Sequence, residues 1–248
     1  MSRAAFAASV TAGVILLATA ISSRGGERRT LCPGSLVPAY VYPDAILTLA
    51  ERGTLPQLLV INPASGPGAA ADAEYRHAIA AAQAAGSRVL GYIATTWGAR
   101  PAAEVSDEID RYRDWYRVDG VFLDEAASDE AHLTHYHALI HHARAEGARF
   151  VVLNPGLVPA RGYFDLADVV VTFEGPISAY DADSADEGVE PERSAHLVFA
   201  ASREQALRAI GSVTSARYVY MTSGTLPHPW GTVPDYLAQE LAALGGCR

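Results

Sequence analysis

The segment Asp119-Gly120-Val121-Phe122-Leu123-Asp124-Glu125 runs four apolar or small residues directly into two carboxylates. A short continuous apolar run is typical of a strand that is buried on both faces, as in a parallel sheet. Because a buried unpaired carboxylate is costly, we expect Asp124 and Glu125 to lie where the strand ends and a cavity opens. The alternative is an acidic strand end that only caps the following helix, since aspartate is a good N-cap residue.

A second segment has the same form. Asp168-Val169-Val170-Val171-Thr172-Phe173-Glu174-Gly175 also carries an apolar strand into a carboxylate, that of Glu174. Two buried strands that each end in an acid indicate a site built from paired carboxylates.

Strand-like and helix-like segments alternate along the rest of the chain. The predicted strands are Leu36–Tyr40, Leu58–Asn62, Arg88–Ile93, Gly120–Leu123, Phe150–Asn154, Asp168–Phe173, His196–Ala200 and Tyr218–Thr222. The predicted helices are Asp44–Arg52, Asp72–Ala85, Ala103–Arg117, Asp129–Glu146, Arg203–Ile210 and Pro234–Leu244, with weaker helical signals after strands five and six. Eight such units in about 215 residues predict a compact α/β fold, the (β/α)8 TIM barrel. An open doubly wound sheet is the alternative fold, but no GxGxxG follows the first strand.

The amino-acid composition restricts the classes of protein to which this chain can belong. The chain has 248 residues, of which 50% are hydrophobic and 19% are charged, and its formal net charge is −9. These values favour a single globular domain over disorder, and we assign that domain to residues 32–248. An excess of acidic residues argues against a nucleic-acid partner. We expect a monomer.

The N-terminal 20 residues have the pattern of a signal peptide. Arg3 is the single charge among the first 23 residues, and the apolar run that follows ends in the small-residue sequence Ala18-Thr19-Ala20. An uncleaved membrane anchor is the alternative, because the run approaches the length that spans a bilayer. Residues 21–31 read as a polar tether. The sequence therefore predicts a secreted protein with no membrane contact after cleavage of the leader.

Two cysteines, Cys32 and Cys247, bracket the predicted domain. In an exported protein the simplest interpretation is one disulfide that joins the two ends of the barrel at its bottom face. Two unrelated free thiols are the alternative. The cysteines show none of the spacings of a zinc site.

Active sites of such barrels lie at the carboxyl ends of the strands and in the loops that follow. This rule brings together a polar and aromatic set: Tyr40, Tyr42, Asn62, Tyr92, Thr95, Trp97, Asp124, Glu125, Asn154, Glu174, Thr222, His228 and Trp230. The set is similar to that of a sugar-binding cleft, in which rings stack on aromatic side chains and sugar hydroxyls bond to amides and acids. For Trp97 and Trp230 the alternative is packing within loops.

Two other patterns are interpreted as solvated surface. His137 and His141 stand four residues apart on a predicted helix, but they lack the glutamate of an HExxH zinc motif. The segment from Tyr180 to Glu192 holds six acids and no basic residue. A functional alternative for that segment is an acidic rim that attracts a cationic polymer.

Six blocks of sequence carry a family resemblance. They are Pro38-Ala39-Tyr40-Val41-Tyr42-Pro43, Asn62-Pro63-Ala64-Ser65-Gly66-Pro67-Gly68, Gly91-Tyr92-Ile93-Ala94-Thr95-Thr96-Trp97-Gly98, Asp119 to Glu125, Leu153-Asn154-Pro155-Gly156 and Phe173-Glu174-Gly175. In this order they resemble the motifs of the spherulin-4-like family over roughly residues 36–240. The chain departs from that pattern at Ala64, where asparagine is usual, and at Trp97, where tyrosine is usual.

The resemblance implies a secreted TIM-barrel glycoside hydrolase. It implies endo-acting cleavage of α-1,4-linked galactosamine or N-acetylgalactosamine polysaccharide, with no metal and no organic cofactor. It maps the essential acids onto Asp124, Glu125 and Glu174. A non-catalytic carbohydrate-binding or envelope protein is one alternative, and a glycosidase for another amino-sugar polymer is a second.

Glycoside hydrolysis uses two carboxyl groups, one protonated and one ionised. We assign Asp124 as nucleophile or charge stabiliser and Glu174 as acid/base, with Glu125 either orienting one of them or bonding a substrate amine. Strand alternation predicts that only one of Asp124 and Glu125 faces the barrel axis. One strand separates the ends of strands four and six, and a narrow barrel mouth favours a short gap between the acids. We therefore expect retention of anomeric configuration.

Overall fold

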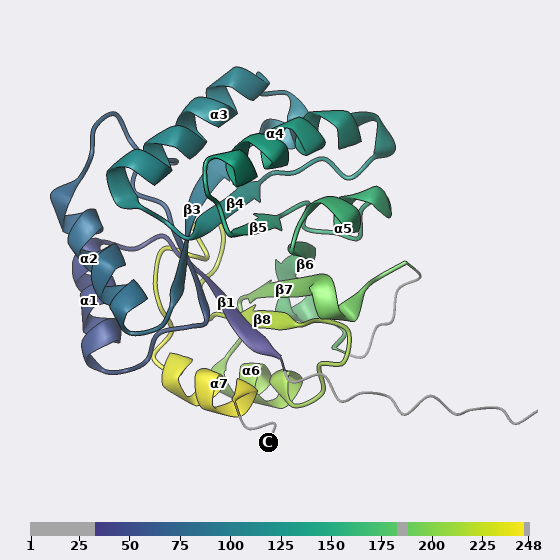
Figure 1. Ribbon diagram of the computed structural model, residues 1–248. Helices are drawn as coiled ribbons and strands as arrows, with labels where there is room; N and C mark the ends of the chain where they lie inside the picture. Colours follow the sequence, from purple (N-terminus) through teal and green to yellow (C-terminus); the bar gives the residue numbers. More distant parts are fainter. Residues whose placement is uncertain (1–32, 183–187, 246–248) are drawn as a thin grey trace, which may run out of the picture.

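Eight parallel strands close into a barrel in the order in which they occur in the chain (Figure 1). The computed structural model describes residues 33–182 and 188–245. The strands are β1 (Gly34–Ala39), β2 (Leu58–Ile61), β3 (Arg88–Ala94), β4 (Gly120–Asp124), β5 (Phe150–Leu153), β6 (Val169–Pro176), β7 (Ser194–Phe199) and β8 (Tyr218–Met221). β1 pairs in parallel with both β2 and β8, which closes the sheet. The predicted TIM barrel is confirmed, and the open doubly wound sheet is wrong.

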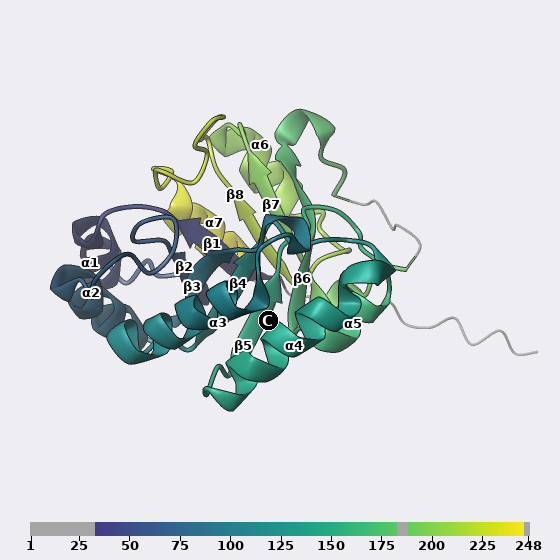
Figure 2. The same cartoon turned by 90° about the horizontal axis from the view of Figure 1, so that it is seen from above.

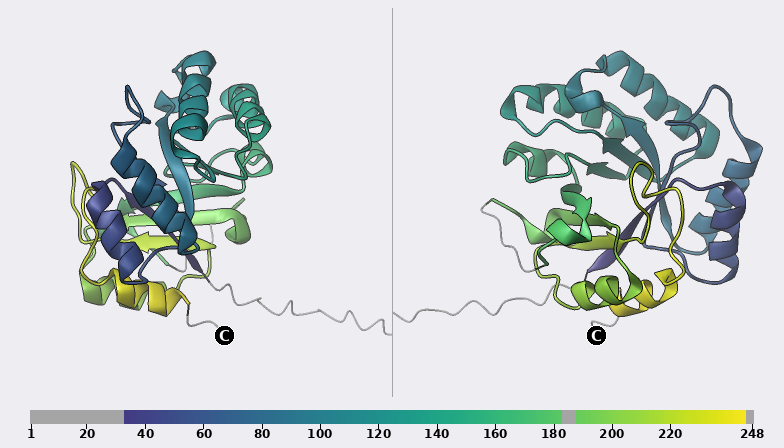
Figure 3. Two further views of the ribbon diagram at one scale, coloured as in Figure 1. Left: turned by 60° about the vertical axis from the view of Figure 1, so that its left-hand side comes forward. Right: turned by 180° about the vertical axis from the view of Figure 1, so that it is seen from behind.

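Helices surround this barrel on its outside, as the view from above shows (Figure 2). They are α1 (Pro43–Glu51), α2 (Ala73–Ala84), α3 (Ala102–Arg111), α4 (Leu133–Ala145), α5 (Gly162–Leu166), α6 (Arg203–Ile210) and α7 (Leu237–Leu244). α1 packs beside α2, α3 beside α4, and α6 beside α7 (Figure 3). All six helices predicted from the sequence are present.

The connection from β6 to β7 departs from the regular pattern. Its described residues form two short 3-10 turns, Ile177–Ala179 and Pro191–Arg193, in place of an α-helix. α5, before β6, is only five residues long. The weak helical signals after strands five and six therefore correspond to a short helix and to 3-10 turns.

Strand burial explains the apolar runs of the sequence. Every residue of β2 and of the Gly120–Leu123 part of β4 is buried, as expected for strands covered on both faces. Their side chains join a core that includes Leu59, Val121 and Phe122, none of which is more than 1% exposed. This packing fixes the strand ends, and with them the positions of the polar residues that follow.

Several element boundaries differ from the sequence prediction, and in two elements the backbone itself becomes irregular. β6 does not end at Phe173 but continues to Pro176, and its pairing with β7 shifts between Val171 and Phe173, as at a β-bulge. The third helix ends at Arg111 and continues as a π-helical turn over Tyr112–Tyr116, before Arg117 adopts a left-handed conformation.

Gly120 in β4 lies against a neighbouring strand without room for a side chain. A Cβ atom at this position would collide with the carbonyl oxygen of Phe150 in β5 and lie 3.0 Å from Leu90. We expect Gly120→Ala to lower the free energy of unfolding by about 3 kcal/mol or more, because backbone cannot move aside as a side chain does. Urea unfolding followed by circular dichroism measures this loss.

Gly211, at the end of α6, provides the matched control. It has an ordinary helical φ of −65°, and a Cβ there would lie 3.5 Å from its nearest neighbour, the Arg208 carbonyl oxygen. Gly211→Ala is expected to change stability by no more than about 0.5 kcal/mol. Equal losses in the two variants would show that close strand packing is not the cause.

Several sequence predictions fall outside the described residues. The leader and the polar tether precede residue 33, and both members of the predicted Cys32–Cys247 disulfide also lie outside this part of the chain. Among the described helices, none has the length and apolar character needed to cross a membrane.

Candidate active site

The central polar side chains lie at the carboxyl ends of three adjacent strands, at one end of the barrel. Asp124 is the last residue of β4, Asn154 directly follows β5, and Glu174 lies near the end of β6. Because β4, β5 and β6 are neighbours and parallel, their carboxyl ends meet at the same mouth. Asn154 is 5% exposed, and both acids are partly exposed.

The Asn154 side chain joins the two acids. Its Nδ2 atom donates one hydrogen bond to Asp124 Oδ1 at 2.6 Å and another to Glu174 Oε2 at 2.5 Å. Because both bonds share one nitrogen, these two carboxylate oxygens lie no more than about 5.1 Å apart, the sum of the two bond lengths. Asn154 is itself held in place, because its Oδ1 accepts a hydrogen bond from the Gly156 backbone N–H at 3.0 Å.

Further polar groups act on each acid. The Glu125 backbone and the Tyr92 side chain, in addition to Asn154, favour the ionised form of Asp124 and so act to lower its pKa. The Trp230 side chain does the same for Glu174, again in addition to Asn154. Polar groups of this kind stabilise the ionised form of a carboxyl group.

Burial opposes that stabilisation and leaves both acids weaker than usual. Burial, followed by the charge of Glu174, raises the pKa of Asp124 from 3.8 to about 7. Burial also raises the pKa of Glu174. Two carboxyl groups so close together titrate as a pair, and such a pair holds one proton over a range of pH below the higher value.

Glu125 begins the loop after β4 with a left-handed backbone, φ 50°. Its carbonyl oxygen accepts hydrogen bonds from Trp97 N at 2.6 Å and from Thr95 Oγ1 at 2.9 Å. Of the two adjacent acids, Asp124 is the one bonded to Asn154 in the barrel mouth. The contact with Asn154 places the Asp124 carboxyl beside Glu174.

A cavity of about 400 Å³ opens beside Glu174. Its walls come from β1, β2, β6, β7 and the β8–α7 loop, and comprise Tyr40, Asn62, Glu174, Phe199, Leu226, Pro227, His228, Pro229, Trp230 and Gly231. The aromatic rings, prolines and Leu226 supply apolar surface, and Asn62, His228 and Tyr40 supply hydrogen-bonding groups. A cavity that combines apolar walls with a few convergent polar groups suits a small organic ligand.

Tyr40, which directly follows β1, and Tyr92 of β3 interact with the acids. The rings of Tyr40 and Tyr92 pack edge to face with their centroids 5.2 Å apart. Burial, followed by the charge of Asp124, raises the pKa of both hydroxyls, so both stay protonated and can donate hydrogen bonds.

Two predicted aromatic residues lie on the rim. Tyr42 is 81% exposed and Trp97 is 60% exposed. Trp97 has a left-handed backbone with φ 50°, as does its neighbour Thr96 with φ 49°. Non-glycine residues seldom adopt this conformation, which is concentrated at ligand sites, and here it presents an indole to solvent.

Two predicted substrate contacts are corrected by the structure. Thr95 and Thr222 are both fully buried. The Thr95 hydroxyl bonds to backbone and to Tyr136, and the Thr222 hydroxyl accepts the Gly224 N–H. Both residues directly follow the last residue of their strand, yet their hydroxyls are bonded inside the protein rather than free to contact a ligand.

Trp230 is intermediate between the exposed rim residues, Tyr42 and Trp97, and the buried threonines. It is 7% exposed and packs against Tyr220 and Phe199, yet it also lines the cavity beside Glu174 and acts to lower the pKa of that acid. It therefore combines loop packing with a position in the site.

Sequence reasoning missed Phe199, Leu226 and Tyr136. Phe199 ends β7, so the rule that sites lie at strand ends was sufficient to find it. Leu226 belongs to a loop without a recognisable motif. Tyr136 lies on α4, and nothing in its helical pattern separates it from core residues.

Two histidines of α4 belong to its exposed face. His137 and His141 are exposed, with stacked rings whose centroids are 6.5 Å apart. Among the described residues, Asp110, His142 and Glu146 bring potential metal-ligand atoms within 4.8 Å of one another. Arg113 forms ion pairs with both of these acids, so the cluster reads as an ion-pair network between α3 and α4.

Part of the acidic segment after β6 lies outside the described residues, namely Asp183, Asp186 and Glu187. The described Tyr180 packs against Phe173 and His196, with ring centroids 5.1 and 5.5 Å away. The predicted acidic rim stays a prediction.

Comparison with solved structures supports the fold. The crystal structure of Aspergillus clavatus Sph3 in complex with GalNAc matches with a TM-score of 0.75 and 23% identity, over 86% of this chain and 98% of that one. An O-GlcNAc hydrolase mutant from Thermobaculum terrenum matches with a TM-score of 0.54 and 9% identity, over 85% of this chain and 59% of that one.

Comparison of sequences supports the family. Spherulin-4 of Physarum polycephalum is 30% identical over 230 residues, which cover 84% of this chain and 69% of that protein. The model of spherulation-specific family 4 matches residues 35–244, nearly the whole described barrel. The predicted resemblance is confirmed, and the chain belongs to spherulation-specific family 4.

Proposed function

We propose that this protein is a glycoside hydrolase that cleaves within α-1,4-linked galactosamine or N-acetylgalactosamine polysaccharides. The observation that carries the proposal is the pair of carboxyl groups, Asp124 and Glu174, joined by Asn154 at the mouth of the barrel. Hydrolysis of a glycosidic bond requires two such groups, one on each side of the bond that breaks.

We assign Asp124 as the nucleophile and Glu174 as the acid/base. Burial and the charge of Glu174 raise the pKa of Asp124 to about 7, so the shared proton must pass to Glu174 before Asp124 attacks. Glu174 gives its proton to the glycosidic oxygen while Asp124 attacks the anomeric carbon, and the leaving sugar departs. Glu174 then takes a proton from water, the resulting hydroxide displaces Asp124, and both acids return to their starting states.

The short gap between the acids supports retention of configuration. Carboxyl groups of retaining enzymes lie about 5 to 5.5 Å apart, whereas inverting enzymes leave about 6.5 to 9.5 Å for a water molecule. The facing oxygens here lie no more than about 5.1 Å apart, by the two bonds to Asn154. An α-anomer as the first product, followed by proton NMR, would support retention, and a β-anomer would contradict it.

Two observations support the class of substrate. The cavity beside Glu174 has apolar and aromatic walls with a few polar groups, as expected for a sugar that carries an apolar substituent. The related Sph3 crystal structure contains GalNAc.

Secretion is part of the proposal and depends on the N-terminal leader pattern in the sequence.

A panel of defined oligosaccharides tests the function. The purified protein is incubated with α-1,4-linked chains of N-acetylgalactosamine, of galactosamine and of both, and with a β-1,4-linked N-acetylglucosamine chain as control. Mass spectrometry reads the products. Internal cleavage of an α-linked chain supports the proposal, and binding without cleavage of any chain would instead favour a carbohydrate-binding protein. Cleavage restricted to the β-linked chain would indicate another amino-sugar polymer.

Activity is expected to fall as the pH rises through about 7, because the pair must hold one proton and the pKa of Asp124 is raised to about 7. The lower limb of the profile reports the lower pKa of the same pair. A profile of kcat/KM from pH 4 to 9 on the cleaved oligosaccharide measures both limbs. Full activity at pH 9 would contradict the shared proton.

Trp97→Ala is expected to raise KM about tenfold with little change in kcat. The indole is 60% exposed on the rim, so its loss removes a stacking surface without reaching the acids. Loss of an aromatic contact is worth about 1 kcal/mol beyond its buried area, and 1.4 kcal/mol corresponds to a factor of ten. His137→Ala on the exposed face of α4 is the control and is expected to leave both constants unchanged.

A further inference from the structure

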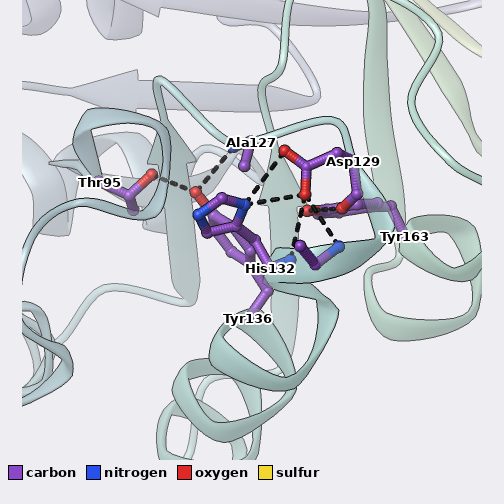
Figure 4. A network of polar contacts seen from close by, with 7 residues as sticks. Thr95, Ala127, Asp129, His132, Tyr136 and Tyr163 are labelled. Atoms are coloured by element: carbon purple, nitrogen blue, oxygen red, sulfur yellow. Dashed lines mark hydrogen bonds and ion pairs between the residues drawn. The ribbon is translucent and has the colours of Figure 1, made fainter.

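A chain of buried hydroxyl groups lies under the loop that carries the acids (Figure 4). Tyr136 Oη accepts a hydrogen bond from Ala127 N at 2.9 Å and lies 2.7 Å from Thr95 Oγ1. Thr95 Oγ1 lies 2.9 Å from the carbonyl oxygens of both Asp124 and Glu125. Thr95 and Tyr136 are both 0% exposed, so water does not replace these partners.

The direction of each bond follows from what each group can donate. Carbonyl oxygens only accept, so the single hydroxyl proton of Thr95 must point to Asp124 and Glu125. Tyr136 must then donate its proton to Thr95, while its oxygen accepts from Ala127. The chain therefore runs from Ala127 through both hydroxyls to the two carbonyls, and every proton in it is used.

These carbonyls belong to a strained turn. Glu125 has φ 50°, and the facing residue Trp97, whose N–H also bonds to the Glu125 carbonyl, has the same φ. Left-handed non-glycine residues persist only where surrounding bonds hold them. The Asp124 carbonyl has a second donor, Thr95 N at 2.9 Å. Thr95 thus bonds to the turn through both backbone and hydroxyl.

We propose that Thr95 and Tyr136 are positioning residues that set the Asp124–Glu125 turn, and through it the nucleophilic carboxyl group of Asp124. The inference rests on the proposed function. A small rotation of this turn moves the carboxyl of Asp124 relative to the anomeric carbon, and misplacement by about 1 Å can cost about 100-fold in rate.

The far end of the same loop is anchored without these hydroxyls. Ala160 N donates to the Ser128 carbonyl oxygen at 2.8 Å, and Tyr163 Oη donates to the Asp129 carbonyl oxygen at 2.9 Å. Figure 4 shows Tyr163 at Asp129, on the side of Tyr136 away from Thr95. Tyr163 is also 0% exposed, and its ring packs beside that of Tyr136 with centroids 5.5 Å apart. It is therefore a matched control for the loss of a buried tyrosine hydroxyl.

Four variants of the full chain test the proposal: Thr95→Val, Thr95→Ser, Tyr136→Phe and Tyr163→Phe. Kinetics use the oligosaccharide that the wild type cleaves. We expect Thr95→Val and Tyr136→Phe to lower kcat by about 10- to 100-fold with little change in KM, because substrate contacts remain in place while the acid shifts. Thr95→Ser keeps the hydroxyl and is expected to restore most of kcat. Tyr163→Phe is expected to keep wild-type kcat while losing stability to a similar extent as Tyr136→Phe.

A second measurement does not depend on turnover. Amide hydrogen exchange of Trp97, Glu125 and Ala127, followed by NMR, is expected to accelerate in Thr95→Val and Tyr136→Phe but not in Tyr163→Phe. Wild-type kcat in Thr95→Val, or equal loss of kcat in Tyr163→Phe, would overturn the positioning role. If the wild type cleaves no oligosaccharide, the proposed function fails, and the exchange rates alone decide whether the hydroxyl chain holds the turn.

Discussion

Asp124→Asn is expected to lower kcat by about 10⁴-fold while the protein stays folded. The substitution changes charge with little change in volume, and the amide oxygen can still accept the Asn154 N–H that reaches Asp124 Oδ1 at 2.6 Å. What is lost is the nucleophile. Glu174→Gln is expected to cost about 10² to 10⁴-fold, because it removes the proton donor and leaves the nucleophile in place. Steady-state kinetics on the cleaved oligosaccharide, with circular dichroism as the check on folding, measure both.

A substrate with an activated leaving group separates the two roles. An aryl glycoside whose phenol leaves without protonation needs the nucleophile but not the acid. Glu174→Gln should therefore form the covalent intermediate rapidly with this substrate, whereas Asp124→Asn should remain slow. Rapid reaction of the Asp124→Asn variant would show that the two acids have the opposite roles. Near-wild-type activity of either variant on the natural linkage would show that the substituted acid takes no part in the mechanism.

Stability gives an independent check on Asp124. Its pKa is raised by folding from 3.8 to about 7, so the folded state favours the protonated form. Its contribution to stability is then fully present below about pH 4 and is lost as the pH rises through about 7. Asparagine is neutral throughout. The melting temperature of Asp124→Asn should match that of the wild type near pH 4 and exceed it increasingly up to pH 8.

Asn154→Ala is expected to lower kcat by about 10³-fold. The side chain donates to both acids, at 2.6 and 2.5 Å, and it is 5% exposed, so water does not easily take its place. Removal of one preorganised donor from such a site costs about 10² to 10³-fold. Both limbs of the pH profile should also move to higher pH, because the lost hydrogen bonds had lowered the pKa of each acid.

Asn62→Ala is the matched control for that prediction. Asn62 also follows a barrel strand and lines the same cavity, but its described hydrogen bond joins Oδ1 to the Gly66 N–H at 2.8 Å. We expect a change in KM without a shift of the pH profile. An equal shift in both variants would show that the bridge between the acids does not set their pKa values.

The eight-strand barrel was predictable from local sequence, because each strand is buried on both faces and must be almost entirely apolar. Leu58–Ile61 and Gly120–Leu123 illustrate the pattern, with every residue buried. The positions of Asp124, Asn154 and Glu174 followed from the same signal, since a polar residue at the end of such a run must lie where the strand reaches the surface. The predicted strand ends thus indicated both the barrel fold and the end of the barrel at which the site lies.

The sequence did not predict which residues of the site are exposed and which are buried. Thr95 and Trp97 are two residues apart in one loop, yet Thr95 is 0% exposed and Trp97 is 60% exposed. Whether a residue after a strand touches ligand or supports the loop depends on the neighbouring turn, here through the hydrogen bonds from Thr95 to the Asp124 and Glu125 carbonyls. Such bonds join residues about thirty positions apart, and no local pattern records them.

The sequence by itself therefore determined the barrel fold, the family and the positions of Asp124 and Glu174 at the ends of their strands. Strict burial restricts which residues can occupy a strand, and strand order fixes which ends meet. Only the tertiary structure decided that one amide joins Asp124 to Glu174, that β6 continues past Phe173 after a register shift, and that Tyr136 on α4 reaches the turn under the acids. The physical reason is that hydrogen bonds depend on distances of a few tenths of an ångström between elements remote in sequence, whereas burial depends only on the kind of residue at each position.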